Sequence, residues 1–363
     1  MLNCYLLGSL VLTSHAMGNY SQSSLSAIPY TQTTSTKGRQ MDNRTFSVII
    51  GCEHSPVSLR STLLALEENN AEVIVVDTVG QVERKNVVAE AAGWGMEVWY
   101  LHVPHSDKAG AWNAASKNAS GTILAFVDDD CIPLPGWLQA LEDTFAEGNI
   151  GAVGGPDQVP DNAPLFEQCL ESVLTSFIGT VGMRSGKQIA SYYPRPWNMA
   201  VDKKAFVSAG GFDQTMPQAP ELPMLRKIEA QGYEIRYQPQ AVVWHHRETN
   251  LLRFMRRDFR LSMERGKKKS QPGLDKIYGA VCLGLLAAGI ASSRRSNSRY
   301  VSAVAKSYAA LLGASGIQAA ARQKSPALAA LVPPLMLAHH TAHIGGYMCG
   351  KVVGILESKR SKI

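Results

Sequence analysis

Between residues 46 and 130, short apolar runs alternate with stretches whose apolar residues recur at helical spacing. The apolar runs are Phe46–Gly51, Glu72–Asp77, Glu97–Val103 and Thr122–Val127, and the helical stretches are Leu59–Glu68, Val82–Ala92 and Ala109–Ala119. Continuous apolar runs of this length are typical of strands buried on both faces, as in parallel sheets. Strands and helices in alternation predict right-handed β-α-β units. We therefore expect an α/β fold with a mostly parallel, Rossmann-like sheet flanked by helices.

Acidic residues follow two of the predicted strands. Asp77 ends the second strand, and the fourth runs directly into Asp128, Asp129 and Asp130. In open parallel sheets ligands bind beyond the carboxyl ends of the strands, so these carboxylates are predicted to share one site. Adjacent carboxylates raise one another's pKa, and a bound hard cation relieves that repulsion. A divalent ion there bridges the phosphates of a nucleotide. The alternative is an acidic turn that caps the next helix.

Two histidines and a glutamate also stand at the ends of predicted elements. The strand Ala241–Trp244 delivers His245 and His246, and only one of them can face the site because alternate residues point to opposite sides. A histidine beside the aspartates gives a mixed oxygen and nitrogen site that suits Mn²⁺ or Mg²⁺; the alternative is an ordinary satisfied polar side chain. Glu221 precedes a predicted helix at Met224–Gln231. It is either a carboxylate favoured by the helix dipole or a general base.

The two ends of the chain differ in composition from its centre. Residues 18–44 are rich in Ser, Thr, Gln and Asn, so residues 1–45 are predicted to form a disordered or non-native extension. A basic run at Arg253–Lys269 opens the C-terminal region. It suits an anionic membrane surface or simply a solvated face. No nucleic-acid reading motif accompanies it, so we expect no nucleic-acid partner.

Apolar stretches follow the basic run at Ile277–Ser292 and Pro326–Leu337, and Pro333-Pro334 and Gly345-Gly346 interrupt the pattern. The first stretch is shorter than the roughly 20 residues that a spanning helix needs. We expect helices that lie on a membrane, cross it imperfectly or pack on the rest of the protein. None of the 6 cysteines forms a Cys-x-x-Cys pair, which favours reduced structural thiols in the cytoplasm over a disulfide framework or a zinc site.

Short motifs occur in one order across the centre of the chain. They are KAGAWNAA at Lys108–Ala115, FVDDDCIPLPGWL at Phe126–Leu138, VGGP at Val153–Pro156, NMAVDKKAF at Asn198–Phe206, GGFD at Gly210–Asp213 and GYEIRYQPQAVVWHH at Gly232–His246. In this order the chain resembles family 2 glycosyltransferases of the GT-A fold, inverting enzymes that use nucleotide-diphosphate sugars. The resemblance predicts a GT-A domain at 46–250. The basic run and the apolar stretches predict a helical C-terminal region at 251–363 that either associates with a membrane or packs on the rest of the protein.

The resemblance implies how the donor binds. Asp77 would contact the nucleotide base, and Asp128 the sugar or phosphates of the nucleotide. Lys108, Asn113 and Asp129 would complete the nucleotide-sugar site. One departure falls here, because Gly-Cys-Glu-His at 51–54 stands where the family often has Pro-Thr-Tyr-Asn after the first strand.

The resemblance also implies a metal site and a catalytic base. Asp130 would ligate Mn²⁺ or Mg²⁺, with His245 as a further ligand. Glu221 would take the proton of an acceptor hydroxyl, which then attacks the anomeric carbon in line with the leaving diphosphate. The family's Glu-Asp pair is here Pro-Glu, so the base is longer by one methylene. Trp197 and Asn198 are predicted on the acceptor side, where the tryptophan offers a stacking surface for a sugar; the alternative is core packing.

These expectations define one leading hypothesis. The chain would move a sugar from a nucleotide-diphosphate donor to the hydroxyl of a glycan or lipid-linked acceptor, at the cytoplasmic face of the cell membrane, as in polysaccharide biosynthesis. The alternatives are a nucleotidyltransferase-like enzyme and a catalytically degenerate member of the family that binds a nucleotide or glycan without turnover.

Overall fold

The computed structural model describes residues 45–160, 162–180, 192–216, 219–246, 250–267, 280–282, 284–286, 289–290 and 299–360. The predictions for residues 1–44, for Lys268 and Lys269, and for most of Ile277–Ser292 fall outside these ranges.

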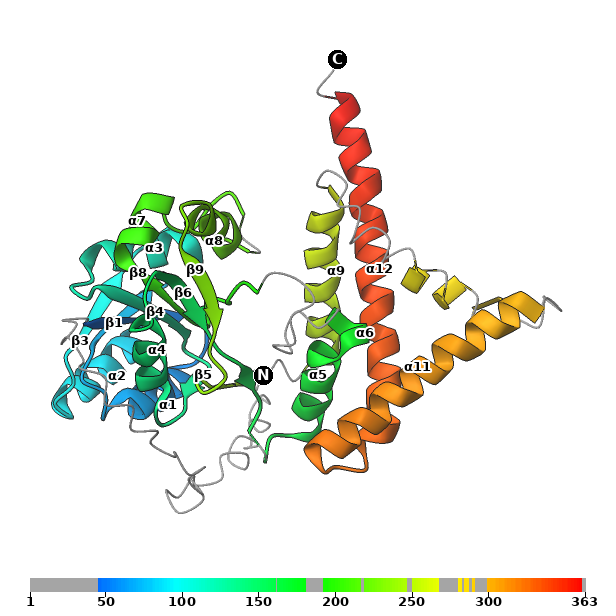
Figure 1. The fold of residues 1–363 in the computed structure, drawn as a ribbon, viewed down its shortest axis with the longest axis horizontal. Helices are drawn as coiled ribbons and strands as arrows, with labels where there is room; N and C mark the ends of the chain where they lie inside the picture. Colours follow the sequence, from blue (N-terminus) through cyan, green and yellow to red (C-terminus); the bar gives the residue numbers. More distant parts are fainter. Residues whose placement is uncertain are drawn as a thin grey trace, which may run out of the picture. The chain divides into compact units, whose positions relative to one another are not determined.

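A seven-stranded sheet organises the N-terminal part of the described chain (Figure 1). Its strand order is β3-β2-β1-β4-β8-β6-β9. The strands are β1 (Phe46–Cys52), β2 (Glu72–Asp77), β3 (Val98–His102), β4 (Ile123–Asp128), β6 (Ile150–Gly154), β8 (Asn198–Asp202) and β9 (Glu234–Tyr237). β1 pairs in parallel with β2 and β4, and β2 with β3, whereas β8 runs antiparallel between β4 and β6. The predicted mostly parallel α/β sheet is confirmed.

Helices cover both faces of this sheet. Val48 and Ile50 of β1 pack with α1 (Pro56–Leu66), α2 (Val82–Gly93) and α4 (Trp137–Phe145). Ile49 points to the other face, where it packs with α3 (Lys108–Asn118), α7 (Lys203–Ala209) and α8 (Glu221–Ala230). Because successive side chains of a strand point to opposite faces, burial on both sides explains why each strand is a continuous apolar run.

Side-chain caps fix where several of these helices begin. The Ser55 hydroxyl accepts a hydrogen bond from the amide of Ser58 at the start of α1. Asp107 accepts one from the amide of Gly110 at the start of α3. Such caps satisfy amide groups that the first turn of a helix leaves without a partner. They hold the first turn of α3, which carries Lys108, next to the carboxyl ends of the strands.

A second sheet, of three strands, begins directly after β4. Its order is β5 (Cys131–Pro133), β10 (Val243–His245) and β7 (Asp157–Gln158). β10 runs antiparallel to β5 with His245 opposite Cys131, and parallel to β7. This register carries a histidine from far along the sequence to the aspartates that follow β4.

A group of helices forms a separate apolar cluster. Its members are α5 (Leu165–Thr175), α6 (Phe177–Thr180), α9 (Leu251–Lys267), α11 (Arg299–Gln323) and α12 (Leu328–Arg360). Leu170 and Val173 of α5 pack with Phe254 of α9 and with Val332 and Met336 of α12. The cluster therefore draws on residues from both sides of position 250, where the sequence predicts the end of the GT-A domain.

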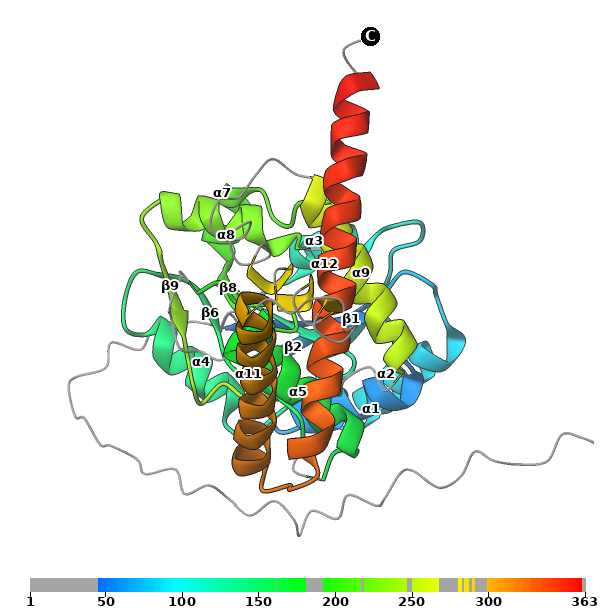
Figure 2. The same cartoon turned by 90° about the vertical axis from the view of Figure 1, so that its right-hand side faces the viewer.

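The last helix is continuous where the sequence predicts interruptions. α12 runs through Pro333-Pro334 and Gly345-Gly346, and α9 packs along it in both views (Figures 1 and 2). A Cβ added at Gly346 would overlap the carbonyl oxygen of Phe259, so the glycine permits a close approach of the two backbones. Among the described helices, none is both long enough and apolar enough to cross a membrane.

Candidate functional site

The carboxyl ends of β1, β2 and β4 lie at one edge of the sheet. Cys52 is paired in register with Asp77, and Gly51 with Asp128. The sequence-predicted carboxylates therefore flank the end of β1 from its two neighbouring strands, where ligands bind in sheets of this kind. The topology brings them together because β1 lies between β2 and β4, although the three strands are well separated in sequence.

Asp77 is fully buried and its carboxylate is surrounded by donors. Oδ1 accepts from the amide of Val79 at 2.9 Å and from Nη1 of Arg84 at 2.8 Å. Oδ2 accepts from the amide of Gln81 at 3.0 Å and from the Tyr100 hydroxyl at 2.8 Å. Burial alone would raise the pKa of Asp77, but these hydrogen bonds hold it below its usual range. Asp77 thus fixes the loop after β2, and its predicted contact with a base stays a prediction.

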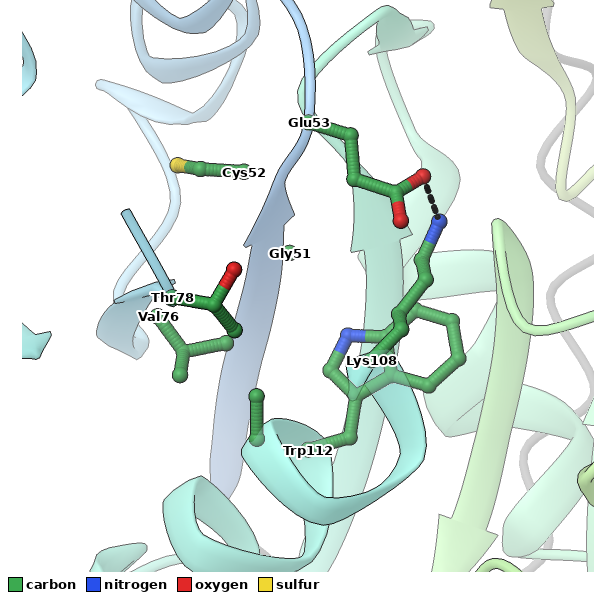
Figure 3. Close-up of a pocket in the computed structure, with 8 residues that line it drawn as sticks. Gly51, Cys52, Glu53, Val76, Thr78, Lys108 and Trp112 are labelled. Carbon is green, nitrogen blue, oxygen red and sulfur yellow. Dashed lines mark hydrogen bonds and ion pairs between the residues drawn. The ribbon is translucent and has the colours of Figure 1, made fainter. Parts of the chain in front are cut away.

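Lys108 and Glu53 form the charged part of the lining of a small open pocket (Figure 3). The Lys108 ammonium donates to Oε2 of Glu53 at 2.8 Å and to Oδ2 of Asp128 at 2.9 Å, and it lies 4.9 Å from the centre of the Trp112 ring. Burial favours the neutral amine, yet the charges of Asp128 and Glu53 raise the pKa of Lys108. The lysine is therefore a fixed positive charge at the mouth of the pocket. The floor is Gly51, where a Cβ would lie 2.7 Å from Nε1 of Trp112.

In the part of the chain that the structure describes, one carboxylate oxygen of Asp128 has no partner. Burial raises the pKa of its carboxyl group, and Lys108 opposes that shift. Among the described residues nothing donates to Oδ1, which is buried. A buried carboxylate oxygen without a donor costs free energy on the order of 1–3 kcal/mol or more. A ligand or ion that contacts this oxygen would recover that cost.

Asp129 is fully buried and bonds to the loop after β1. Its carboxylate accepts from the amides of Glu53 and His54 at 3.2 and 2.8 Å, and its Oδ1 lies 2.9 Å from Nδ1 of His54. The hydrogen bond with Asp129 is the main reason that the pKa of His54 is raised to about 9. Asp129 therefore positions His54, and its predicted part in donor binding stays a prediction.

Asp130 lies between two imidazoles. Its Oδ2 is 3.4 Å from Nε2 of His54 and 3.4 Å from Nε2 of His245. Burial would raise the pKa of Asp130, but the contact with His245 and the charges of His54 and Lys108 together lower it to about 2. His246 faces elsewhere, with its Nδ1 3.7 Å from Oε2 of Glu167. His245 and His246 therefore contact different carboxylates, which is consistent with neighbouring strand residues that point to opposite faces.

A second layer of hydrogen bonds orients His245. Its Nδ1 lies 3.4 Å from Oδ2 of Asp157, which also accepts from Nε1 of Trp197 at 3.1 Å. The rings of His245 and Trp197 are 5.4 Å apart at their centres. Carboxylates behind a histidine in this way fix its orientation and raise its basicity toward a metal. Trp197, predicted on the acceptor side, therefore contributes to the support of His245.

The side chains at this edge suit a hard divalent cation. Asp130 and His245, together with the neighbouring Cys131, offer ligand atoms that all lie within 4.8 Å of one another. One carboxylate and one imidazole are ligands typical of Mn²⁺ and acceptable to Mg²⁺, whereas a thiol is too soft for either. The lone Oδ1 of Asp128 adds a further oxygen at the same strand end. The donor set therefore fits the expected metal.

Glu221 begins α8 and is almost fully buried, with 3% of its side chain exposed. Its Oε1 accepts from Nη1 of Arg195 at 2.8 Å. Burial raises the pKa of Glu221, while the charges of Arg195 and Lys108 act in the opposite direction. A raised pKa makes a carboxylate a stronger base, which suits the role of general base.

Two predicted asparagines have their amides committed to the fold. Asn113 accepts from the amide of Phe212 and donates to its carbonyl, both at 2.9 Å, which ties α3 to the loop before α8. Asn198 accepts from Nε1 of Trp137 at 2.8 Å and donates to the carbonyls of Pro156 and Ala241. Of the two alternatives for Asn198, core packing describes its contacts. Direct ligand contact by either asparagine stays a prediction.

Three residues that the sequence did not single out for these roles complete the site. Arg84 pairs with Asp77 and donates to the carbonyl of His54 at 2.5 Å. Asp157 supports His245, and Arg195 pairs with Glu221. Asp157 directly follows the VGGP motif, which gave a signal for it. Arg84 and Arg195 are recognisable only once the fold places them against buried carboxylates.

Comparison with known proteins shows what this chain is similar to. Residues 47–206 match the sequence model described as glycosyl transferase family 2. A pre-mycofactocin glycosyltransferase of Mycobacterium tuberculosis (strain H37Rv) is 28% identical over 220 residues, which is 58% of this chain and 44% of the relative. The succinoglycan biosynthesis protein ExoM of Rhizobium meliloti is 32% identical over 124 residues, 32% of this chain and 40% of the relative. The chain thus spans less than half the length of these relatives.

A solved structure has the same fold. The mannosyltransferase PcManGT from Pyrobaculum calidifontis, in complex with GDP-Man and Mn²⁺, aligns with a TM-score of 0.55 at 17% identity and covers 83% of this chain and 87% of its own. The fold of this chain is therefore the GT-A fold, as the sequence predicted. The sequence similarity to glycosyl transferase family 2 covers residues 47–206, which is less than half of the chain.

Proposed function

We propose that this protein is an inverting glycosyltransferase that moves a sugar from a nucleotide-diphosphate donor to an acceptor hydroxyl. The observation that carries the proposal is the arrangement of side chains at the end of β4, where Asp128 bonds to Lys108 and Asp130 contacts His245. A cation for phosphates and ligands for a metal ion thus meet at one strand end. The names of the two relatives, a glycosyltransferase and a polysaccharide biosynthesis protein, support a glycan or lipid-linked acceptor.

The donor side of the site holds one ammonium group, that of Lys108, to meet the phosphates. Lys108 projects into the pocket lined by Gly51 and Trp112, and we assign it to the diphosphate of the donor. Asp128 would meet the sugar or phosphates through its Oδ1. Asp77, Asp129 and Asn113 would then act mainly by holding the loops that shape this pocket, since their polar atoms already serve backbone groups there.

Asp130 and His245 would hold a divalent cation, Mn²⁺ or Mg²⁺. When bound, such an ion neutralises charge on the phosphates of the leaving nucleotide. The contact between His54 and Asp130 would be exchanged for the ion. Asp157 and Trp197 would keep His245 oriented for binding.

Glu221 would act as the general base. Its carboxylate takes the proton from the acceptor hydroxyl, the hydroxyl oxygen forms a bond to the anomeric carbon, and the bond from that carbon to the diphosphate oxygen breaks. The nucleoside diphosphate leaves with the electron pair of that bond. Because the oxygen attacks from the side opposite to the leaving group, the anomeric configuration inverts. Arg195 would hold the carboxylate ionised and oriented.

We further propose that the acceptor is met at a cytoplasmic membrane surface. One face of α9 exposes four arginines, Arg253, Arg256, Arg257 and Arg260. Near its end α12 exposes an apolar group formed by Met348, Val352, Ile355 and Leu356. Basic and apolar groups on exposed helices favour attachment to anionic lipid headgroups.

The test of the catalytic proposal is Glu221→Gln. The amide keeps the size of the side chain but takes no proton, so transfer should fall by at least the roughly 10²-fold that general bases contribute. Donor binding, measured by calorimetry, should stay within about twofold of the wild-type value because the amide replaces the carboxylate away from the phosphates. Unchanged turnover would remove the base assignment.

A further inference from the structure

A second cluster of metal-ligating side chains lies in the helical group, outside the site described above. Asp258 of α9 and His339 and His343 of α12 each offer one ligand atom, and all three atoms lie within 4.8 Å of one another. The two histidines are four residues apart, so they lie on one face of the helix. Asp258 and His339 are buried, and His343 has only 18% of its side chain exposed.

The hydrogen bonds around His339 leave one of its nitrogens directed at the cluster. Its Nε2 lies 3.0 Å from the carbonyl oxygen of Gly179 in α6. A carbonyl only accepts, so Nε2 carries a proton and Nδ1 is the atom that meets Oδ2 of Asp258. Metal-bound histidines nearly always donate their other ring N–H to a carbonyl or carboxylate. His339 already has that arrangement.

His343 completes the cluster on the next turn of α12. Its Nδ1 lies 3.8 Å from Oδ1 of Asp258. Asp258 therefore lies between the two imidazoles, with Oδ2 facing His339 and Oδ1 facing His343. A neutral imidazole and an ionised carboxylate are the forms that bind metals.

We propose that Asp258, His339 and His343 bind a transition-metal ion of the Zn²⁺ class. Two imidazole nitrogens and one carboxylate oxygen favour such an ion over Mg²⁺ or Ca²⁺, which take oxygen ligands. The ion would replace the proton shared by His339 and Asp258, and a water would supply the fourth ligand. Since the ligands come from α9 and α12, and His339 also holds α6, the ion would join these three helices.

Neighbouring residues offer matched controls. His340 is buried beside His339, but its Nε2 lies 2.8 Å from the carbonyl of Ile178 and its Nδ1 2.7 Å from the Tyr308 hydroxyl. It therefore tests burial and packing without supplying a ligand. Arg265 is exposed, and its Nη1 lies 3.4 Å from Nε2 of His343. Its positive charge opposes a cation in the cluster, so its removal should strengthen metal binding.

The experiment is a Zn²⁺ titration of the full chain, followed by calorimetry, in excess Mg²⁺. The Asp130→Asn variant is titrated in parallel to remove the aspartate at the sheet edge. We expect one Zn²⁺ per chain that Asp130→Asn retains. His343→Gln and Asp258→Asn should each weaken the binding of this Zn²⁺ ion. The loss of affinity should exceed the roughly 10-fold to 100-fold that removal of an outer-shell partner costs. His340→Gln should retain it, and Arg265→Gln should bind more tightly.

Two results would overturn the proposal. One is a wild-type chain that binds no Zn²⁺ beyond what Asp130→Asn removes. The other is Zn²⁺ binding that His343→Gln leaves unchanged. If a cluster variant does not fold, Co²⁺ added to the Asp130→Asn chain decides instead, because tetrahedral nitrogen and oxygen ligation gives a strong visible absorption. A Co²⁺ spectrum like that of the aqueous ion would reduce the cluster to a buried histidine–aspartate pair.

Discussion

Replacing Arg195 by glutamine tests how the site controls its proposed base. Arg195 donates to Glu221 at 2.8 Å, and it is the largest of the effects that oppose the rise in the pKa of that carboxyl. Glutamine keeps a polar side chain of moderate length but removes the charge. The pKa of Glu221 should therefore rise further above its ordinary value.

The size of the rise follows from the exposure of the two partners. Breaking a fully buried pair costs about 3–5 kcal/mol, and an exposed pair contributes less than about 1 kcal/mol. Glu221 has 3% of its side chain exposed but Arg195 has 33%, so the pair lies between these limits. We take about 2 kcal/mol, which corresponds to about 1.5 pKa units at roughly 1.36 kcal/mol per unit.

The assay is the rate of sugar transfer against pH at saturating donor. The carboxylate is the active form of a base, so activity is lost as the pH falls through the pKa of Glu221. In Arg195→Gln the acidic limb should move to higher pH by about 1.5 units, while the plateau above it is largely kept.

The contribution of Glu221 to the free energy of unfolding should fall as the pH rises, whereas the rate of transfer should increase. When the folded-state pKa of an acid lies above its unfolded-state value, stability is lost as the pH rises through the folded-state pKa. The destabilisation of Arg195→Gln should thus be larger near about pH 8 than near about pH 5, in urea unfolding. Arg236→Gln, which removes an exposed arginine paired with Glu234, is the matched control and should move neither curve. A uniform loss of rate at every pH would refute the pairing argument.

Three further outcomes are expected. Asp157→Asn should weaken Mn²⁺ binding by roughly 10-fold to 100-fold in calorimetry, because the support of the histidine ligand is lost; equal affinity would remove that role. Gly155→Ala should destabilise the fold by about 3 kcal/mol or more in urea, since its Cβ would overlap the Ala241 carbonyl oxygen, whereas Gly93→Ala, with open space around it, should be neutral or slightly stabilising. The double change Arg256→Gln and Arg257→Gln should weaken binding to vesicles of anionic phospholipid about 30-fold, from about 1 kcal/mol per arginine, and binding that ignores both changes and salt would exclude this surface.

The sequence predicted β1, β2 and β4 better than β6 and β8. β1, β2 and β4 are continuous apolar runs. The stretches between them have helical spacing, so the pattern predicts alternating strands and helices. β8 and β6 are short and interrupted by small or polar residues, so periodicity gave little signal for them. α12 shows a different limit. Gly345-Gly346 reads as a helix break, but in the structure a glycine there lets the backbones of α9 and α12 meet.

In the site, strand-end residues were predictable and their supports were not. Asp128 and Asp130 stand out because a buried strand leads directly into them. The partners Arg84 and Arg195 come from other elements, and only the tertiary fold brings them to Asp77 and Glu221. Asn198 shows why a polar residue in a family motif is ambiguous. Its amide joins three segments of the interior, a role that no local pattern reveals.

The most direct test of the account is donor binding with and without metal. The full chain is titrated with a panel of nucleotide-diphosphate sugars, in Mn²⁺ and in chelator, and the titration is repeated with Asp130→Asn and Glu221→Gln. We predict that one donor binds in Mn²⁺, that chelator or Asp130→Asn abolishes this binding, and that Glu221→Gln keeps it. Binding of no donor, or binding indifferent to both Mn²⁺ and Asp130→Asn, would contradict the proposed site.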